Sequence, residues 1–138
     1  MKFALDDVEM DGQLQRTVTA AYSGSADIGE AMATAQRVIA GDYNSWHDEW
    51  AALAVKTSSL ADERANRGPR VSAAKAYLRA TEYWRQAIFF IRGNLDDPRL
   101  LNGWQAHRAA FRQALPLLPW DVTITEIPFD VGTMTTYL

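Results

Sequence analysis

The stretch Ser45–Arg92, SWHDEWAALAVKTSSLADERANRGPRVSAAKAYLRATEYWRQAIFFIR, decides the fold. Apolar residues recur in it every three or four positions, which is the period of a helix that buries one face. The pattern is interrupted at Gly68-Pro69, because glycine is favoured just after a helix end and proline cannot continue a helix. The stretch therefore predicts two amphipathic helices joined by a tight turn.

This stretch is also rich in aromatic side chains, among them three of the five tryptophans of the chain. Most of these rings are expected in the core, but Tyr and Trp also favour surfaces that are part apolar and part wet, such as pocket walls and interfaces. Tyr83 and Trp84 are adjacent and point about 100° apart on a helix. Both can be fully buried only if that helix is covered on more than one side. The candidates for a substrate pocket or an interface are Trp46, Trp50, Tyr77, Tyr83 and Trp84.

Two shorter helices are expected before this stretch. Residues 13–22 place Leu14, Val18 and Tyr22 on one face, and a second apolar stripe runs over residues 28–39. Ser25 or Asp27 is expected to cap the second helix, and Gly41-Asp42 to end it. In the central stretch, Ser45 is the expected cap of the third helix and Ser72 that of the fourth.

The remainder of the chain predicts one more helix and then two strands. Asp97 is a good cap with Pro98 at the first helical position, and the flanks of Asn102-Gly103 have a helical period. After the prolines at 116 and 119, residues 121–127 alternate in a two-residue period, residues 130–132 form a turn and residues 133–138 form a second strand. The expected fold is therefore mainly α, an antiparallel bundle of about five helices (residues 1–118) followed by a β-hairpin (residues 119–138).

Composition excludes several classes of function. The 138 residues carry a net charge of −3, so no basic field exists to hold nucleic acid or an anionic membrane. The absence of cysteine removes disulfides, thiolate metal sites and cysteine nucleophiles, and it fits a reducing compartment. No apolar run is long enough for a signal peptide or a membrane span, so a cytoplasmic protein is expected.

No motif in the chain predicts catalysis, a metal site or a cofactor. A G-x-S-x-G nucleophile elbow is absent, and Gly24 and Gly29 lack the Lys-Ser/Thr that a phosphate loop requires. The two histidines, His47 and His107, lie on different predicted helices without the spacing of a zinc site. His47 is expected on a solvated or second helix face, with a substrate-facing role as the alternative, and a structural role is expected for His107. The acid pairs Asp6/Asp7 and Asp96/Asp97 are expected to cap helices or to lie in solvent. The three arginines near the turn are expected to be solvated, with docking of a partner domain as the alternative: Arg64, Arg67 and Arg70.

Three motifs together resemble a known family. They are Gly41-Asp42-x-x-Ser45-Trp46-x-x-Glu49-Trp50-x-x-Leu53-Ala54, then Arg70-Val71-Ser72-Ala73, then Arg79-Ala80-x-x-Tyr83-x-x-x-Ala87-x-Phe89-Phe90. They resemble the N-terminal helical domain of a group of α/β-hydrolases that includes 2,6-dihydroxypseudooxynicotine hydrolase, the FrsA-like esterases and fungal polyketide-processing hydrolases. The closing hairpin resembles the first strands of the hydrolase sheet.

The resemblance implies a lid. In that group, the helical domain covers the active site and often helps to form a dimer, while a later Ser-Asp-His set cleaves an ester or C–C bond. No residue of this chain corresponds to that set, so the chain is expected to be part of a serine-type hydrolase, inactive alone, with the catalytic domain as its partner. The hairpin would then be the start of a truncated hydrolase domain. The alternatives are a tetratricopeptide-like interaction module, suggested by residues 111–119, and a bundle that binds a small molecule.

Overall fold

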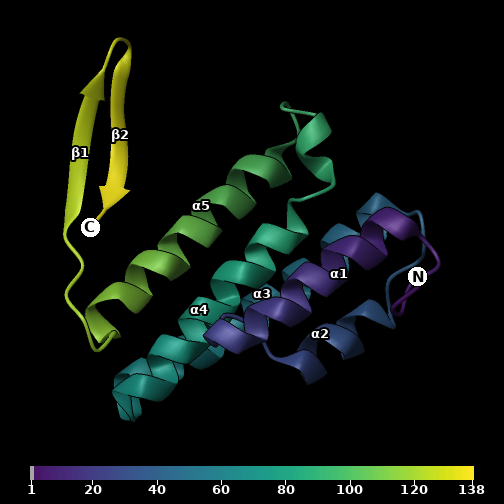
Figure 1. Cartoon of the computed structure of the whole chain (residues 1–138), viewed down its shortest axis with the longest axis horizontal. Coiled ribbons are helices and arrows are strands. Elements are labelled where there is room, and N and C mark those ends of the chain that lie inside the picture. The colour runs from purple at the N-terminus through teal and green to yellow at the C-terminus, as the bar shows by residue number, and fades with distance from the viewer. Residues whose placement is uncertain (1) are drawn as a thin grey trace.

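The computed structural model describes residues 2–138 and confirms the predicted class: five α-helices and a C-terminal β-hairpin in this part of the chain (Figure 1). Three short 3₁₀ turns follow α1, α4 and α5. The α-helices are α1 (Val8–Ala20), α2 (Ile28–Ala35), α3 (Tyr43–Arg67), α4 (Arg70–Ala87) and α5 (Pro98–Ala114). The turns are η1 (Ala21–Ser23), η2 (Ile91–Gly93) and η3 (Leu115–Leu117), and the strands are β1 (Ile124–Phe129) and β2 (Gly132–Tyr137).

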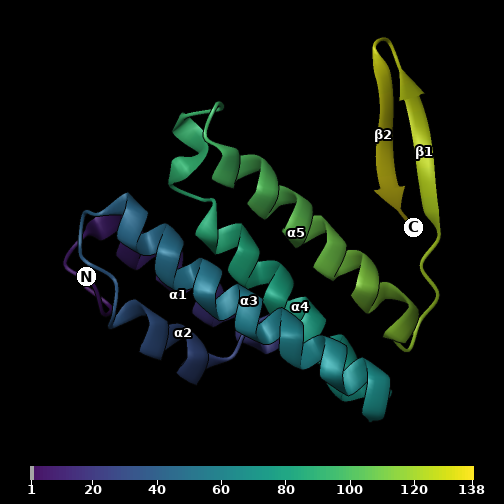
Figure 2. The same ribbon diagram turned by 180° about the vertical axis from the view of Figure 1, so that it is seen from behind.

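The two helices predicted from the central stretch are the longest of the fold. α3 and α4 run antiparallel, joined by Gly68 and Pro69, and the other three helices pack beside them (Figures 1 and 2). Their start residues differ from the prediction. Asp42, not Ser45, caps α3 by accepting hydrogen bonds from the backbone N–H groups of Asn44 (2.9 Å) and Ser45 (3.1 Å). Ser45 lies inside the helix, and its hydroxyl accepts a hydrogen bond from Ile39 N (2.9 Å).

The predicted cap of α4 is also wrong. Ser72 lies in the first turn, and Pro69 is the N-cap because its extended backbone (φ −66°, ψ 120°) feeds directly into Arg70. Proline suits a helix start because the N–H it lacks would have no intrahelical partner there.

The caps of α2 and α5 follow the prediction. Asp27 caps α2 by accepting from Glu30 N, and Asp97 caps α5 ahead of Pro98. α2 ends at Ala35, before the predicted stripe does, and Ile39 is largely exposed. α1 begins at Val8, earlier than predicted, because Asp7 caps it through Met10 N (2.9 Å).

The hairpin forms close to where it was expected. β1 begins at Ile124 and continues through Pro128 to Phe129, and the turn consists of two residues, Asp130 and Val131. Gly132, predicted in the turn, pairs with Phe129 and begins β2. The predicted division into residues 1–118 and 119–138 as separate domains stays a prediction.

The main core lies between α1, α2, α3 and α4. Trp46, Trp50 and Tyr83 are its largest fully buried side chains, and the two indole rings lie 5.4 Å apart. Their polar atoms are satisfied in part by the backbone: Trp46 Nε1 donates to the carbonyl of Gln86 (2.8 Å). Tyr83 OH accepts from Asp27 N (2.9 Å) and donates to the Glu30 carboxylate (2.7 Å).

α5 packs on α4 through a glycine. A Cβ placed on Gly103 would lie 2.2 Å from Ile88 Cγ2, which is too close for any side chain, so the backbone of α5 approaches α4 where only glycine fits. This contact lies on one face of α5, and the face toward the hairpin carries larger polar and aromatic residues. Within residues 2–138, no helix combines the length and the apolar character that a membrane crossing requires.

Candidate interaction groove

The five residues singled out from the sequence lie in the helical body, which is the bundle of α1 to α5. Trp46, Trp50 and Tyr83 are fully buried in the main core. Tyr77 is buried in a second cluster beside Ala61 and Ala114, where its hydroxyl donates to Asp62 (2.6 Å). The fifth residue, Trp84, is partly buried. Their role as pocket walls or interface residues stays a prediction.

Burial and hydrogen bonding raise the pKa of both tyrosines in this set. Burial, with the hydrogen bond to Asp62, raises the pKa of Tyr77 to about 12. Burial, with the hydrogen bond to Glu30, raises the pKa of Tyr83 further. Both shifts favour the neutral phenol, so these hydroxyls serve as structural hydrogen-bonding groups.

The histidines and the predicted charge clusters have structural contacts. His47 is buried with Nδ1 2.9 Å from the carbonyl of Ala87, and His107 has Nδ1 2.9 Å from that of Thr81. Arg67 pairs with Glu63 (3.1 Å) on the exposed end of α3, and Arg70 donates to the carbonyl of Pro116. Across residues 2–138, no group of three or more acidic, histidine or cysteine side chains is arranged to hold a metal ion.

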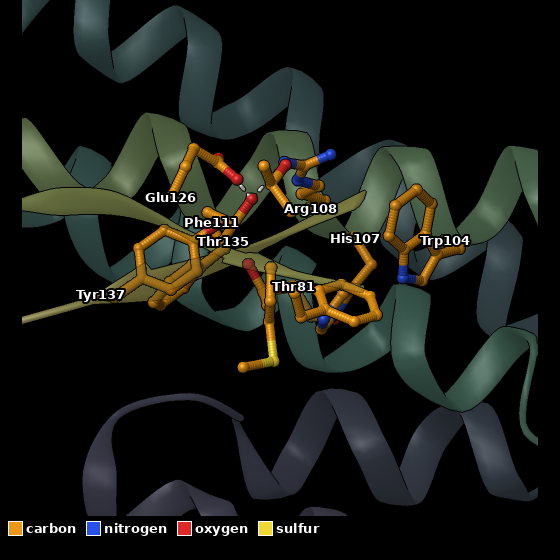
Figure 3. A pocket seen from close by; sticks show the side chains of 11 residues that line it. Thr81, Trp104, His107, Arg108, Phe111, Glu126, Thr135 and Tyr137 are labelled. Atoms are coloured by element: carbon orange, nitrogen blue, oxygen red, sulfur yellow. Dashed lines mark hydrogen bonds between the residues drawn. The ribbon is translucent and has the colours of Figure 1, made fainter. Parts of the chain in front are cut away.

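An open groove of about 900 Å³ lies between α5 and the hairpin. Its helical wall is lined by Trp104, His107, Arg108 and Phe111 of α5, and Thr81 of α4 also lines it (Figure 3). The opposite wall consists of hairpin residues: Glu126, Phe129, Thr133, Met134, Thr135 and Tyr137.

Arg108 bridges the two walls. Its Nη2 donates to Thr135 Oγ1 (3.0 Å), and that hydroxyl donates to Glu126 Oε1 (2.7 Å), as the dashed lines in Figure 3 show. The guanidinium also lies 5.5 Å from the ring centroid of Trp104, within the range of a cation–π contact. A guanidinium has five N–H donors, so this bridge uses only part of its capacity.

A second arginine reaches the same part of the hairpin. Arg112 Nε lies 3.4 Å from Tyr137 OH, and the hydrogen bond from Arg112, followed by that from Arg108, lowers the pKa of Tyr137. The hydrogen bond from Thr135, with the charges of both arginines, lowers the pKa of Glu126. Both guanidinium groups thus act on the Glu126 carboxylate, but Arg108 lines this groove, whereas Arg112 lines a neighbouring hollow beside Leu115 and Trp120.

Sequence reasoning missed this groove. It predicted the fifth helix from its cap and its helical period, without singling out Trp104, which is 46% exposed and lines the groove. A usable signal was present, because Trp104, Arg108 and Phe111 fall at i, i+4 and i+7 and hence on one helix face. The groove is lined by aromatic rings, hydroxyl groups, the Arg108 guanidinium and the Glu126 carboxylate.

Comparisons with known proteins identify relatives along most of the chain. The chain is 40% identical over 105 residues to the 20-hydroxy-prefusarin hydrolase FUS2 of Gibberella moniliformis, a match that covers 76% of this chain and 25% of that protein. It is 36% identical to the hydrolase acrC of Aspergillus aculeatus (83% of this chain, 27% of the relative) and 34% identical to the α/β hydrolase xenA of Xenoacremonium sinensis (88% and 28%). No model of a protein family matches the chain. The chain therefore spans little more than a quarter of the length of these relatives.

Proposed function

We propose, from the premise that this chain belongs with these α/β-hydrolases, that it is the helical lid region of a serine-type hydrolase that cleaves an ester or a C–C bond. The observation that carries the proposal is the extent of the match. Relatives named as hydrolases match 76–88% of this chain, yet the match takes up only 25–28% of their own length. Most of each relative, with room for a nucleophile and its base, lies outside the match.

The structure of the chain supports a lid role. A lid contributes apolar and aromatic walls and excludes water from the reaction, and it needs a rigid body to do so. Here a bundle with buried Trp46, Trp50 and Tyr83 supplies the rigid body, and the open groove beside α5 supplies a recognition surface. The lid covers the active site and helps to shape the substrate pocket, while the catalytic residues come from the hydrolase domain.

Two experiments test this proposal. Residues 1–138 alone should neither hydrolyse p-nitrophenyl acetate nor react with a fluorophosphonate probe, whereas labelling of this chain would contradict the proposal. In the second experiment, the matching segment of the acrC hydrolase is replaced by this chain. The chimera should fold and keep the hydrolase activity of its parent, and a folded but inactive chimera would count against a lid role.

The lengths of the helices count against the alternative of a tetratricopeptide-like module. That repeat consists of helix pairs of similar length, whereas the five α-helices described here contain 13, 8, 25, 18 and 17 residues. The homodimer and the cytoplasmic location remain predictions.

A further inference from the structure

A second hollow lies where the chain leaves the helical body for the hairpin. Its volume is about 320 Å³, which is within the range of small-molecule pockets, and it shares no lining residue with the groove beside α5. The start of α4, the end of α5 and the linker that precedes β1 form its walls. We call it the linker hollow, and the lining residues on which the argument depends are Arg70, Arg112, Leu118, Trp120, Asp121 and Ile124.

Two arginines from different helices meet in the linker hollow. α4 and α5 are neighbours that run in opposite directions, so Arg70, the first residue of α4, lies beside the last turn of α5, which carries Arg112 (Figure 1). The Arg70 side chain donates to the carbonyl of Pro116 in η3, which holds it against the end of α5. Arg112 Nε lies 3.4 Å from Tyr137 OH on the hairpin side. The fold therefore brings both guanidinium groups to one end of the bundle.

Both guanidinium groups have donors left for a ligand. A guanidinium has five N–H donors, and the contacts to Pro116 and Tyr137 use one donor of each arginine. Within residues 2–138, neither Arg70 nor Arg112 takes part in an ion pair. Two like charges in one small hollow repel each other, and an anion between them offsets this repulsion. A carboxylate suits such a position because it accepts two parallel hydrogen bonds from a guanidinium.

The charge and the apolar lining of the linker hollow favour a monocarboxylate. Arg70 and Arg112 contribute two positive charges and Asp121 one negative charge, which leaves a net charge of one positive unit on the lining. A singly charged carboxylate balances this charge, whereas a phosphate group with nearly two negative charges exceeds it. Leu118 and Ile124 supply apolar surface, and Trp120 supplies an exposed indole ring. The lining therefore suits an acid that has an apolar or aromatic body.

We propose that the linker hollow is a binding site for a small monocarboxylic acid with an apolar or aromatic body. Arg70 and Arg112 hold the carboxylate through N–H groups of their guanidinium groups, and Trp120 packs against the body of the ligand. Because the ligand contacts α4, α5 and the linker at once, its binding also stabilises the connection between the helical body and the hairpin. The proposal concerns residues of this chain alone and does not depend on the lid function.

Titration of the 138-residue chain with 3-phenylpropanoate tests the proposal, and 3-phenylpropanamide is the uncharged control. In NMR spectra, the signals of the Trp120 indole N–H and of the Asp121 and Val122 amides should shift with the acid and reach saturation. The uncharged amide should bind at least about tenfold more weakly, because charge-assisted hydrogen bonds are lost. Absence of saturable shifts, equal binding of the two probes, or tighter binding of inorganic phosphate than of the acid would overturn the proposal.

Matched variants separate this hollow from unspecific attraction to arginine, and circular dichroism checks that each variant folds. Arg70→Gln and Arg112→Gln should each weaken binding of 3-phenylpropanoate by about tenfold, and Arg112→Lys should restore only part of it because lysine lacks the planar fork. Arg67→Gln, on the exposed end of α3, should leave binding unchanged. Trp120→Ala should weaken binding of 3-phenylpropanoate but not of acetate, which has no body to pack. Equal weakening by Arg67→Gln would contradict the proposal.

The acrC chimera distinguishes a free acid from an acidic side chain of the hydrolase domain as the source of the carboxylate. Isothermal titration calorimetry should show that the folded chimera binds 3-phenylpropanoate with an affinity similar to that of the 138-residue chain. Loss of binding in the chimera would mean that another part of the hydrolase fills the hollow, and it would overturn the proposal of a free ligand. Because the readout is binding, an inactive chimera that still binds the acid would refute the lid function and support the site.

Discussion

The helical body is stabilised by buried side chains, whereas the hairpin is attached by contacts at the surface. In the body, fully buried rings such as Trp46 and Tyr83 contact several helices and also hydrogen-bond to the backbone of other elements. The hairpin is largely exposed, and α5 reaches it through long side chains, chiefly Arg108, Arg112 and Phe111. The helices are therefore held together by their own packing, whereas much of the hairpin surface is open.

The largest loss of stability is expected from Trp46→Ala in the helical body. This change removes a fully buried indole and its hydrogen bond to Gln86, so the free energy of unfolding should fall by about 3–5 kcal/mol. Urea denaturation followed by circular dichroism measures the loss. The control is Trp120→Ala, because Trp120 is 61% exposed and should contribute little. Comparable losses for the two variants would show that the body is not the stable part.

A smaller loss is expected from Gly103→Ala at the contact between α4 and α5. The added methyl group would overlap Ile88 Cγ2, and overpacking of this kind costs about 1–3 kcal/mol. Gly12→Ala is the matched control, because nothing lies within 4 Å of its Cβ position, and it should stabilise α1 by about 1 kcal/mol. If the double variant with Ile88→Ala shows no coupling, the close approach is not the cause.

Tyr83→Phe probes the hydrogen bonds inside the body. The change keeps the ring but leaves the Asp27 N–H without its acceptor, and the free energy of unfolding should fall by about 1–2 kcal/mol. The control is Tyr22→Phe, because Tyr22 is fully exposed. Thermal unfolding of both variants under one condition is the measurement, and an unchanged Tyr83→Phe protein would mean that the hydroxyl contributes packing only.

The smallest global effect is expected from Thr135→Val in the hairpin. Loss of the hydroxyl removes the bridge between Arg108 and Glu126, yet global stability should change by less than about 0.5 kcal/mol because the body does not depend on it. Amide exchange in β1 and β2 should nevertheless become faster. Thr125→Val, on the other face of the hairpin, should leave that exchange unchanged, and equal exchange in both variants would refute the role of the bridge.

The sequence predicted the elements better than their starts, and it did not predict the groove. Helical periodicity located α3 and α4 because burial of one face dominates their patterns. The start of α3 was wrong because Asp42 and Ser45 are both good capping residues, and only the tertiary fold selects Asp42. Trp104 looks like a core residue by spacing alone, and its exposure depends on the position of the hairpin, which local patterns do not encode.

The contact between Gly103 and Ile88 sets the rotation of α5 as well as its distance from α4. A helix turns about 100° per residue. The close contact of Gly103 with Ile88 therefore also determines how α5 is rotated about its own axis. Trp104 follows one position later and Arg108 one turn beyond it, and both are thereby turned toward the hairpin. The absence of a Cβ atom at Gly103 thus fixes the rotation of α5, and through it the direction in which the largest side chains of this helix point.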